Sequence, residues 1–90
     1  MEYREFLYTP KKTGAVTLRK VYIITENDTY IEGYDLSGVE EKSIYDQMEE
    51  TLKTATAGSR FKEYNSYFRR FLKNRLSLKD ITEIKEQIIL

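Results

Sequence analysis

The sequence predicts an α+β fold, with an N-terminal antiparallel three- to four-stranded bent sheet or incomplete small barrel followed by two to three C-terminal helices. The first 36 residues are rich in Tyr, Val, Ile and Thr, which favour strands, and contain the single Pro. From residue 40 onward, apolar residues recur every three or four positions, which is the helical period. The 90 residues contain no linker rich in Pro, Gly or Ser, so we expect one domain, mainly β over 1–45 and mainly α over 46–90.

Two strands are predicted before residue 26. The first spans residues 3–9 and ends at Pro10, because Pro lacks the backbone donor that a strand needs. The second spans residues 15–25, and its apolar alternation changes phase at Arg19 and Lys20. Such a change of phase predicts a β-bulge or a strong bend at these two residues.

A β-hairpin is predicted next. Residues 26–28 form a short polar turn, and residues 29–36 form a third strand that pairs antiparallel with the second.

Up to three helices are predicted after residue 40. The first ends at Gly58, which we expect to act as the C-terminal cap, and the second begins at Ser59 as its N-cap. The third opens with a capping box at residues 77–80, with Asp in place of Glu. The stripes expected on these helices are Ile44, Met48, Leu52 and Ala55 in the first, Phe61, Tyr64, Phe68, Phe71, Leu72 and Arg75 in the second, and Leu78, Ile81, Ile84 and Ile88 in the third.

The composition excludes many enzyme sites. The chain has no Cys and no His, which removes thiolate nucleophiles, zinc sites built on these residues and the usual general base near neutral pH. Neither of the two common glycine-rich phosphate-binding motifs occurs. We therefore expect a non-enzymatic protein without a cofactor or a metal. No apolar run approaches the roughly 20 residues of a membrane span, so we expect a cytoplasmic protein with no membrane partner.

Charge is distributed unevenly along a chain whose 15 basic and 15 acidic residues cancel. Residues 58–79 hold seven basic residues against Glu63 alone, interleaved with aromatic residues. Basic groups among aromatic rings are typical of surfaces that contact phosphates and stack on bases. The candidate contacts in this segment are Arg60, Tyr67, Arg69, Arg70, Lys73 and Arg75. The same pattern also fits a solvated helix face paired with the acidic residues of the preceding helix.

The hairpin residues resemble a known family. Residues 19–36 read RKVYIITENDTYIEGYDL, and the motif Tyr30–Asp35 is followed by the basic Lys42. This stretch resembles the central hairpin of WYL domains, although Thr29 stands where the family has Trp and residues 46–48 offer no counterpart of the family's second arginine. The similarity covers about residues 15–46 and implies a small SH3-like or Sm-like barrel that senses a ligand or binds single-stranded nucleic acid. It adds Tyr30, Tyr34 and Lys42 to the candidate binding residues.

Taken together, these features predict a small regulatory or accessory protein that engages single-stranded nucleic acid or a nucleotide-like ligand. The alternative is a protein-interaction module, such as an inhibitor or adaptor of the kind that mobile elements or phages encode. It would dock on a larger protein or form a homodimer, and the apolar residues 81–90 favour it.

Overall fold

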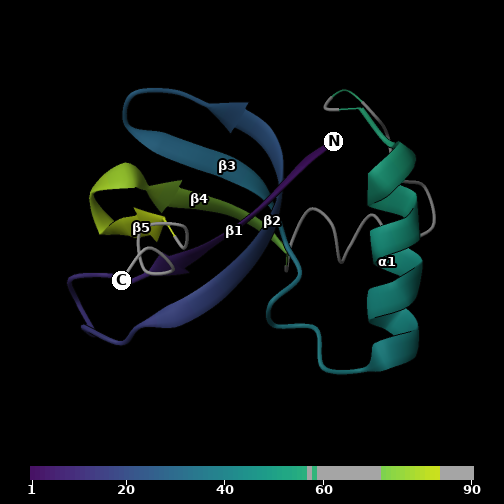
Figure 1. The fold of residues 1–90 in the computed structure, drawn as a ribbon, viewed down its shortest axis with the longest axis horizontal. Coiled ribbons are helices and arrows are strands. Elements are labelled where there is room, and N and C mark those ends of the chain that lie inside the picture. The colour runs from purple at the N-terminus through teal and green to yellow at the C-terminus, as the bar shows by residue number, and fades with distance from the viewer. Residues whose placement is uncertain (57, 59–71, 84–90) are drawn as a thin grey trace.

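The computed structural model describes residues 1–56, 58 and 72–83, which form a curled antiparallel sheet with one α-helix beside it (Figure 1). The elements in chain order are β1 (Glu2–Tyr8), β2 (Thr17–Glu26), β3 (Tyr30–Asp35), α1 (Lys42–Thr54), β4 (Lys73–Ser77), the 3-10 helix η2 (Leu78–Asp80) and β5 (Ile81–Glu83). No helix in these ranges is long and apolar enough to cross a membrane.

The connection between β4 and β5 requires the sheet to curl. The five strands are ordered β4-β3-β2-β1-β5, so β4 and β5 lie at opposite edges although only η2 joins them. Strands are spaced about 4.8 Å apart, so the edges of a flat five-stranded sheet would be roughly 19 Å apart. A 3-10 helix rises only about 2 Å per residue and cannot cover that distance over three residues. The sheet therefore closes towards a partly open barrel (Figure 1).

The alternation of side chains along the strands produces two apolar clusters. One face of the sheet encloses the barrel interior, and α1 packs against part of the other face. The interior consists of Phe6, Val21, Ile23, Ile31 and Leu76, whereas the cluster under α1 consists of Tyr22, Tyr34, Leu36, Met48, Leu52 and Leu72.

Gly33 lets β2 and β3 approach each other closely. A Cβ atom at this position would lie 2.3 Å from the Tyr22 carbonyl oxygen and 2.7 Å from Val21 Cγ1. Any larger residue would therefore force the two strands apart.

The predicted hairpin is confirmed, because β2 and β3 pair antiparallel. The register shift predicted at Arg19 and Lys20 lies instead between Ile23 and Thr25. The first predicted helix is also confirmed as α1, which buries Met48 and Leu52 of the expected stripe. It ends at Thr54 with Ala55 as its C-cap, so the prediction of a cap at Gly58 was wrong.

The predicted fold class was wrong. An N-terminal sheet followed by two to three helices is contradicted by a five-stranded sheet with a single α-helix among the described residues, which makes the protein mostly β. The residues 77–80 predicted to open the third helix form η2 without a side-chain cap, and Ile81 then begins β5. The last residues of the stretch predicted as the second helix form the strand β4, and residues 59–71 of that stretch lie outside the described ranges. Residues 84–90 of the predicted third helix also lie outside them.

The C-terminal strands were mistaken for helices because their apolar spacing is ambiguous. Leu72 and Leu76 are both buried and four residues apart, a spacing that fits one face of a helix. In the structure, Leu72 precedes β4 and packs under α1, whereas Leu76 lies on β4 and packs in the barrel interior. Their pairing depends on distant partners, since Leu76 lies opposite Ile31 and Ile81 lies opposite Tyr8.

Candidate ligand pocket at the end of the barrel

A cavity of about 630 Å³ opens between one end of the sheet and the segment that leads from β3 into α1. Its apolar wall comes from Leu18, Val39, Ile44 and Leu72, and its polar wall from Thr17, Arg19, Asp35, Ser37 and Asn74. Gly38, Glu40 and Glu41 complete the described lining. This mixture of an apolar wall with a few converging polar groups is typical of small-molecule sites.

The centre of the polar wall is an ion pair between Arg19 on β2 and Asp35 on β3. Arg19 has the same strand parity as the inward-facing Val21, and Asp35 the same parity as Ile31, so both charges extend the barrel interior towards its open end. The Arg19 Nη1 atom donates to Asp35 Oδ2 over 2.8 Å. The Asp35 side chain is only 2% exposed, while that of Arg19 is 23% exposed.

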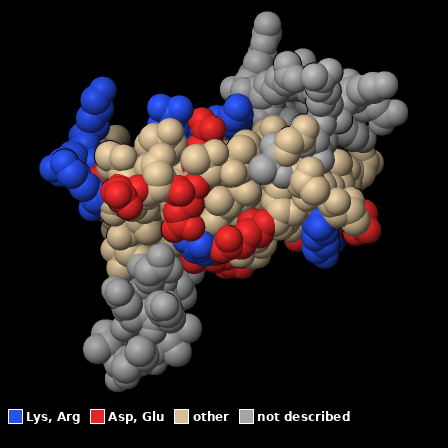
Figure 2. Space-filling view, turned by 90° about the horizontal axis from the view of Figure 1, so that it is seen from above, with Lys and Arg blue, Asp and Glu red and all other residues tan. Residues whose placement is uncertain are grey.

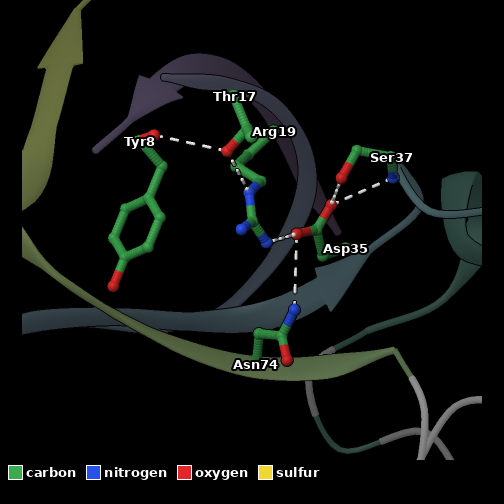
Figure 3. Close-up of polar contacts among 6 residues, drawn as sticks. All are labelled: Tyr8, Thr17, Arg19, Asp35, Ser37 and Asn74. Atoms are coloured by element: carbon green, nitrogen blue, oxygen red, sulfur yellow. Dashed lines mark hydrogen bonds and ion pairs between the residues drawn. The ribbon is translucent and has the colours of Figure 1, made fainter. Parts of the chain in front are cut away.

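Three further donors satisfy the buried Asp35 carboxylate (Figure 3). Ser37 donates to Oδ1 from its backbone nitrogen over 3.0 Å and from its hydroxyl over 2.6 Å. Asn74 on β4 donates to Oδ2 from its amide nitrogen over 3.3 Å. A buried carboxylate needs such partners, because removing an ion from water costs several kcal/mol, on the order of what these bonds return. The network also ties β2, β3 and β4 together at the mouth of the barrel.

The guanidinium of Arg19 is held on its other sides as well. Its Nε atom donates to the Thr17 hydroxyl over 3.0 Å, and its Cζ atom lies 5.1 Å from the centre of the Tyr8 ring. The second terminal nitrogen, Nη2, has no partner among the described residues, and it is the remaining blue atom of Arg19 in Figure 3. The network therefore leaves one guanidinium donor of the cavity-lining Arg19 without an acceptor among the described residues.

The rim of the cavity is acidic. Glu40 and Glu41 are exposed lining residues, and Glu40 makes no ion pair or hydrogen bond within the described ranges. The Glu41 carboxylate accepts a hydrogen bond from the Ser43 hydroxyl over 3.0 Å. On the face shown in Figure 2, acidic and basic side chains are interspersed, and neither sign forms a continuous surface over the described residues.

Tyr30, Lys73 and Arg75 are brought together on β3 and β4, away from this cavity. The Arg75 guanidinium lies 4.2 Å from the centre of the Tyr30 ring and pairs with Glu32 over 3.4 Å. Lys73 is two residues from Arg75 on β4 and therefore lies on the same exposed side of the strand. Among the predicted contacts that the structure describes, Tyr30 and Arg75 are in contact, and Lys73 lies farther along the same side of β4, opposite Tyr34.

The other predicted contacts are placed elsewhere. Tyr34 is 6% exposed and packs under α1, so it belongs to the core rather than to a surface. Lys42 begins α1 and pairs with Asp46 over 3.0 Å, and this hydrogen bond raises the pKa of the Lys42 ammonium group. Arg60, Tyr67, Arg69 and Arg70 lie outside the described residues.

Sequence reasoning missed the network itself. Arg19 was interpreted as part of a predicted bulge or bend and Asp35 as the end of the motif Tyr30–Asp35, so a pair between them was not predicted. The available signal was their parity, because each charge continues an inward-facing apolar series on adjacent strands of the predicted hairpin. Asn74 could not be found in this way, since it lies within a stretch predicted to be helical. Within the described ranges, no group of three or more acidic residues could hold a metal ion.

Comparisons of the chain with family models, with curated proteins and with solved structures give no significant match. The similarity to WYL domains therefore stays a prediction, and the argument for function depends on the geometry of the site.

Proposed function

We propose that this protein is a small non-enzymatic binding protein that takes a nucleotide-like ligand in the cavity beside Arg19. The observation that carries the proposal is the immobilised Arg19 guanidinium, whose Nη2 atom has no partner among the described residues. A ligand with a hydrogen-bond acceptor would satisfy this donor, and its apolar faces would contact the walls formed by Leu18 and Leu72.

The dimensions and chemistry of the cavity support a base-bearing ligand. Its volume of about 630 Å³ lies within the usual range of small-molecule pockets. Arginine is the side chain that most often donates hydrogen bonds to the edges of bases, and Arg19 lines the cavity with Nη2 not engaged by the described residues. Because Asp35 and Thr17 already fix the guanidinium, little side-chain entropy is lost when the ligand binds.

The test is a titration of the protein with nucleosides and nucleotides, followed by isothermal calorimetry and by amide chemical shifts. We expect binding to shift the amides of residues 17–19 and 35–39, and we expect Arg19→Met to weaken it by at least about 10-fold through loss of a charged hydrogen bond. Arg4→Met is the matched control, because Arg4 is also an ion-paired arginine on the sheet, with 25% side-chain exposure against 23% for Arg19. Equal binding by both variants, or no binding by the unmodified protein, would overturn the proposal.

A second candidate function is the binding of single-stranded nucleic acid on the outer side of β3 and β4. It is favoured by the stacked Tyr30 and Arg75 with Lys73 beside them, since aromatic rings and cations bind bases and phosphates together. Fluorescence anisotropy of a labelled oligonucleotide tests it. We expect the double variant Lys73→Ala, Arg75→Ala to weaken binding and reduce its salt dependence, while Lys53→Ala on α1 leaves both unchanged. Unchanged binding in the double variant would exclude this surface.

A further inference from the structure

The charges around the Arg19 cavity restrict the ligand further. Its described lining contains one guanidinium and three carboxylates, those of Asp35, Glu40 and Glu41. Asp35 neutralises Arg19 at 2.8 Å, so the guanidinium donor carries no uncompensated positive charge. Counted over the described lining, the two rim carboxylates then give the opening a negative charge.

Among the described residues, Arg19 is the one basic side chain in the lining of this cavity. Lys20 and Lys42 line a neighbouring hollow together with Asp46, Glu49 and Glu40, and Glu40 is shared with the Arg19 cavity. Lys42 is engaged by Asp46 over 3.0 Å, and the Lys20 ammonium lies 5.6 Å from the centre of the Tyr45 ring. Neither lysine belongs to the described lining of the Arg19 cavity.

We infer that the cavity binds the uncharged, phosphate-free form of its ligand, a free base or a nucleoside, and disfavours the corresponding nucleotide. This inference rests on the proposed function and specifies its ligand class. A neutral carbonyl or ring nitrogen can accept a hydrogen bond from Arg19 Nη2 without being repelled by Asp35.

The inference predicts an unusual response to salt. A phosphate dianion about 8 Å from two carboxylates is repelled, which weakens binding by roughly 10-fold at low salt and by less at physiological ionic strength, where the Debye length is also about 8 Å. Added salt should therefore raise the affinity for a nucleoside monophosphate and leave that for the nucleoside unchanged. A site that binds through phosphate behaves in the opposite way, because added salt weakens phosphate contacts.

The experiment measures the dissociation constants of four nucleosides and their 5′-monophosphates at low and at physiological salt. We expect the best nucleoside to bind about 10-fold more tightly than its monophosphate at low salt, with a smaller ratio at the higher salt. The double variant Glu40→Gln, Glu41→Gln should bind the monophosphate several-fold more tightly while its nucleoside affinity stays within about 2-fold. Glu50→Gln is the control, because Glu50 is exposed on α1 and outside the described lining.

The outcomes separate the inference from the proposed function. Monophosphates that bind as tightly as nucleosides, or whose affinity falls with salt, overturn the inference and leave the proposed function standing. Failure of every nucleoside and every nucleotide to bind overturns the proposed function and the inference with it. An equal increase in affinity for nucleosides and for monophosphates in the Glu40→Gln, Glu41→Gln variant also contradicts the inference. Removal of the rim charge should raise the affinity for the monophosphate dianion alone.

Discussion

Replacement of Asp35 by alanine is expected to lower the free energy of unfolding by about 3 kcal/mol. The carboxylate is 2% exposed and accepts four hydrogen bonds, one of them from the Arg19 guanidinium at 2.8 Å. Removal of one partner from a buried ion pair typically costs about 3–5 kcal/mol, because the other charge remains without compensation. Arg19 keeps 23% exposure, and water can hydrate it in part, which places the expected loss at the lower end of that range.

Urea unfolding followed by circular dichroism measures this loss. A chain of 90 residues has a total stability of roughly 5–13 kcal/mol, so the variant should remain folded enough to give a measurable transition. With a urea dependence of about 1–2 kcal/mol/M, the midpoint should fall by roughly 1.5–3 M. A heat-induced transition should shift downward by more than about 10 °C.

Asp46→Ala supplies the matched control for this variant. It removes the same type of side chain from an ion pair with Lys42 at 3.0 Å, but both partners of that pair are exposed on α1. Exposed pairs of this kind contribute about 0.5 kcal/mol or less. If Asp35→Ala destabilises the protein no more than Asp46→Ala does, the buried network contributes no more than a surface pair and the reasoning is refuted.

Three further predictions concern the barrel, the helix and alkaline pH. Gly33→Ala should lower the free energy of unfolding in urea by at least about 2 kcal/mol, because its Cβ atom would lie 2.3 Å from the Tyr22 carbonyl oxygen. Gly38→Ala is the control: a Cβ atom there has nothing within 4 Å, and the loss should stay below about 0.5 kcal/mol. Similar losses in the two variants would refute the packing argument. Leu52→Ala should cost about 2–5 kcal/mol by the same assay, since this fully buried side chain joins α1 to the sheet, and a loss below about 1 kcal/mol would contradict that role. Burial raises the pKa values of the Tyr3 and Tyr22 hydroxyl groups in the folded protein, so as the pH rises these groups lose their protons first in the unfolded chain. Their contribution to the free energy of unfolding is therefore complete below about pH 10 and falls above it. Tyr3→Phe should flatten that decline in a urea series across alkaline pH, and an unchanged slope would count against this assignment.

Local patterns predicted the parts of the fold that depend on nearby residues. The hairpin of β2 and β3 is encoded by two β-rich stretches around a short polar turn, and α1 by an apolar stripe that includes Met48 and Leu52. The strands β4 and β5 depend on remote partners, since β4 completes the edge beside β3 and β5 the edge beside β1. Their sequences have the polar starts and apolar spacing of short helices, and only the free edges of the sheet select the extended form.

Asn74, between Leu72 and Leu76, was missed as a member of the site because β4 was predicted as part of a helix. Asn74 lies on the same face of β4 as Leu76, two residues away, but on a helix it would point away from Leu76. As part of a strand, its amide reaches Asp35 over 3.3 Å and completes the polar network. The mistaken period therefore concealed a member of the site as well as a strand. None of the predicted binding residues that the structure describes belongs to the described lining of the cavity; these are Tyr30, Tyr34, Lys42, Lys73 and Arg75.

The position of the Arg19–Asp35 ion pair beside the cavity favours a role in binding over a role in packing alone. Apolar residues of similar volume often stabilise a protein as well as a buried ion pair does, so packing alone gives no reason for charges at Arg19 and Asp35. Val21 and Ile31, on the same strand faces farther inside the barrel, fill the interior without any charge. The charged pair supplies a donor fixed in direction at the end of the barrel that opens into the cavity, with Thr17 and Asp35 holding two of its three nitrogens. A fixed donor beside a cavity lowers the entropy lost on binding, which is an advantage only if a ligand with an acceptor binds there.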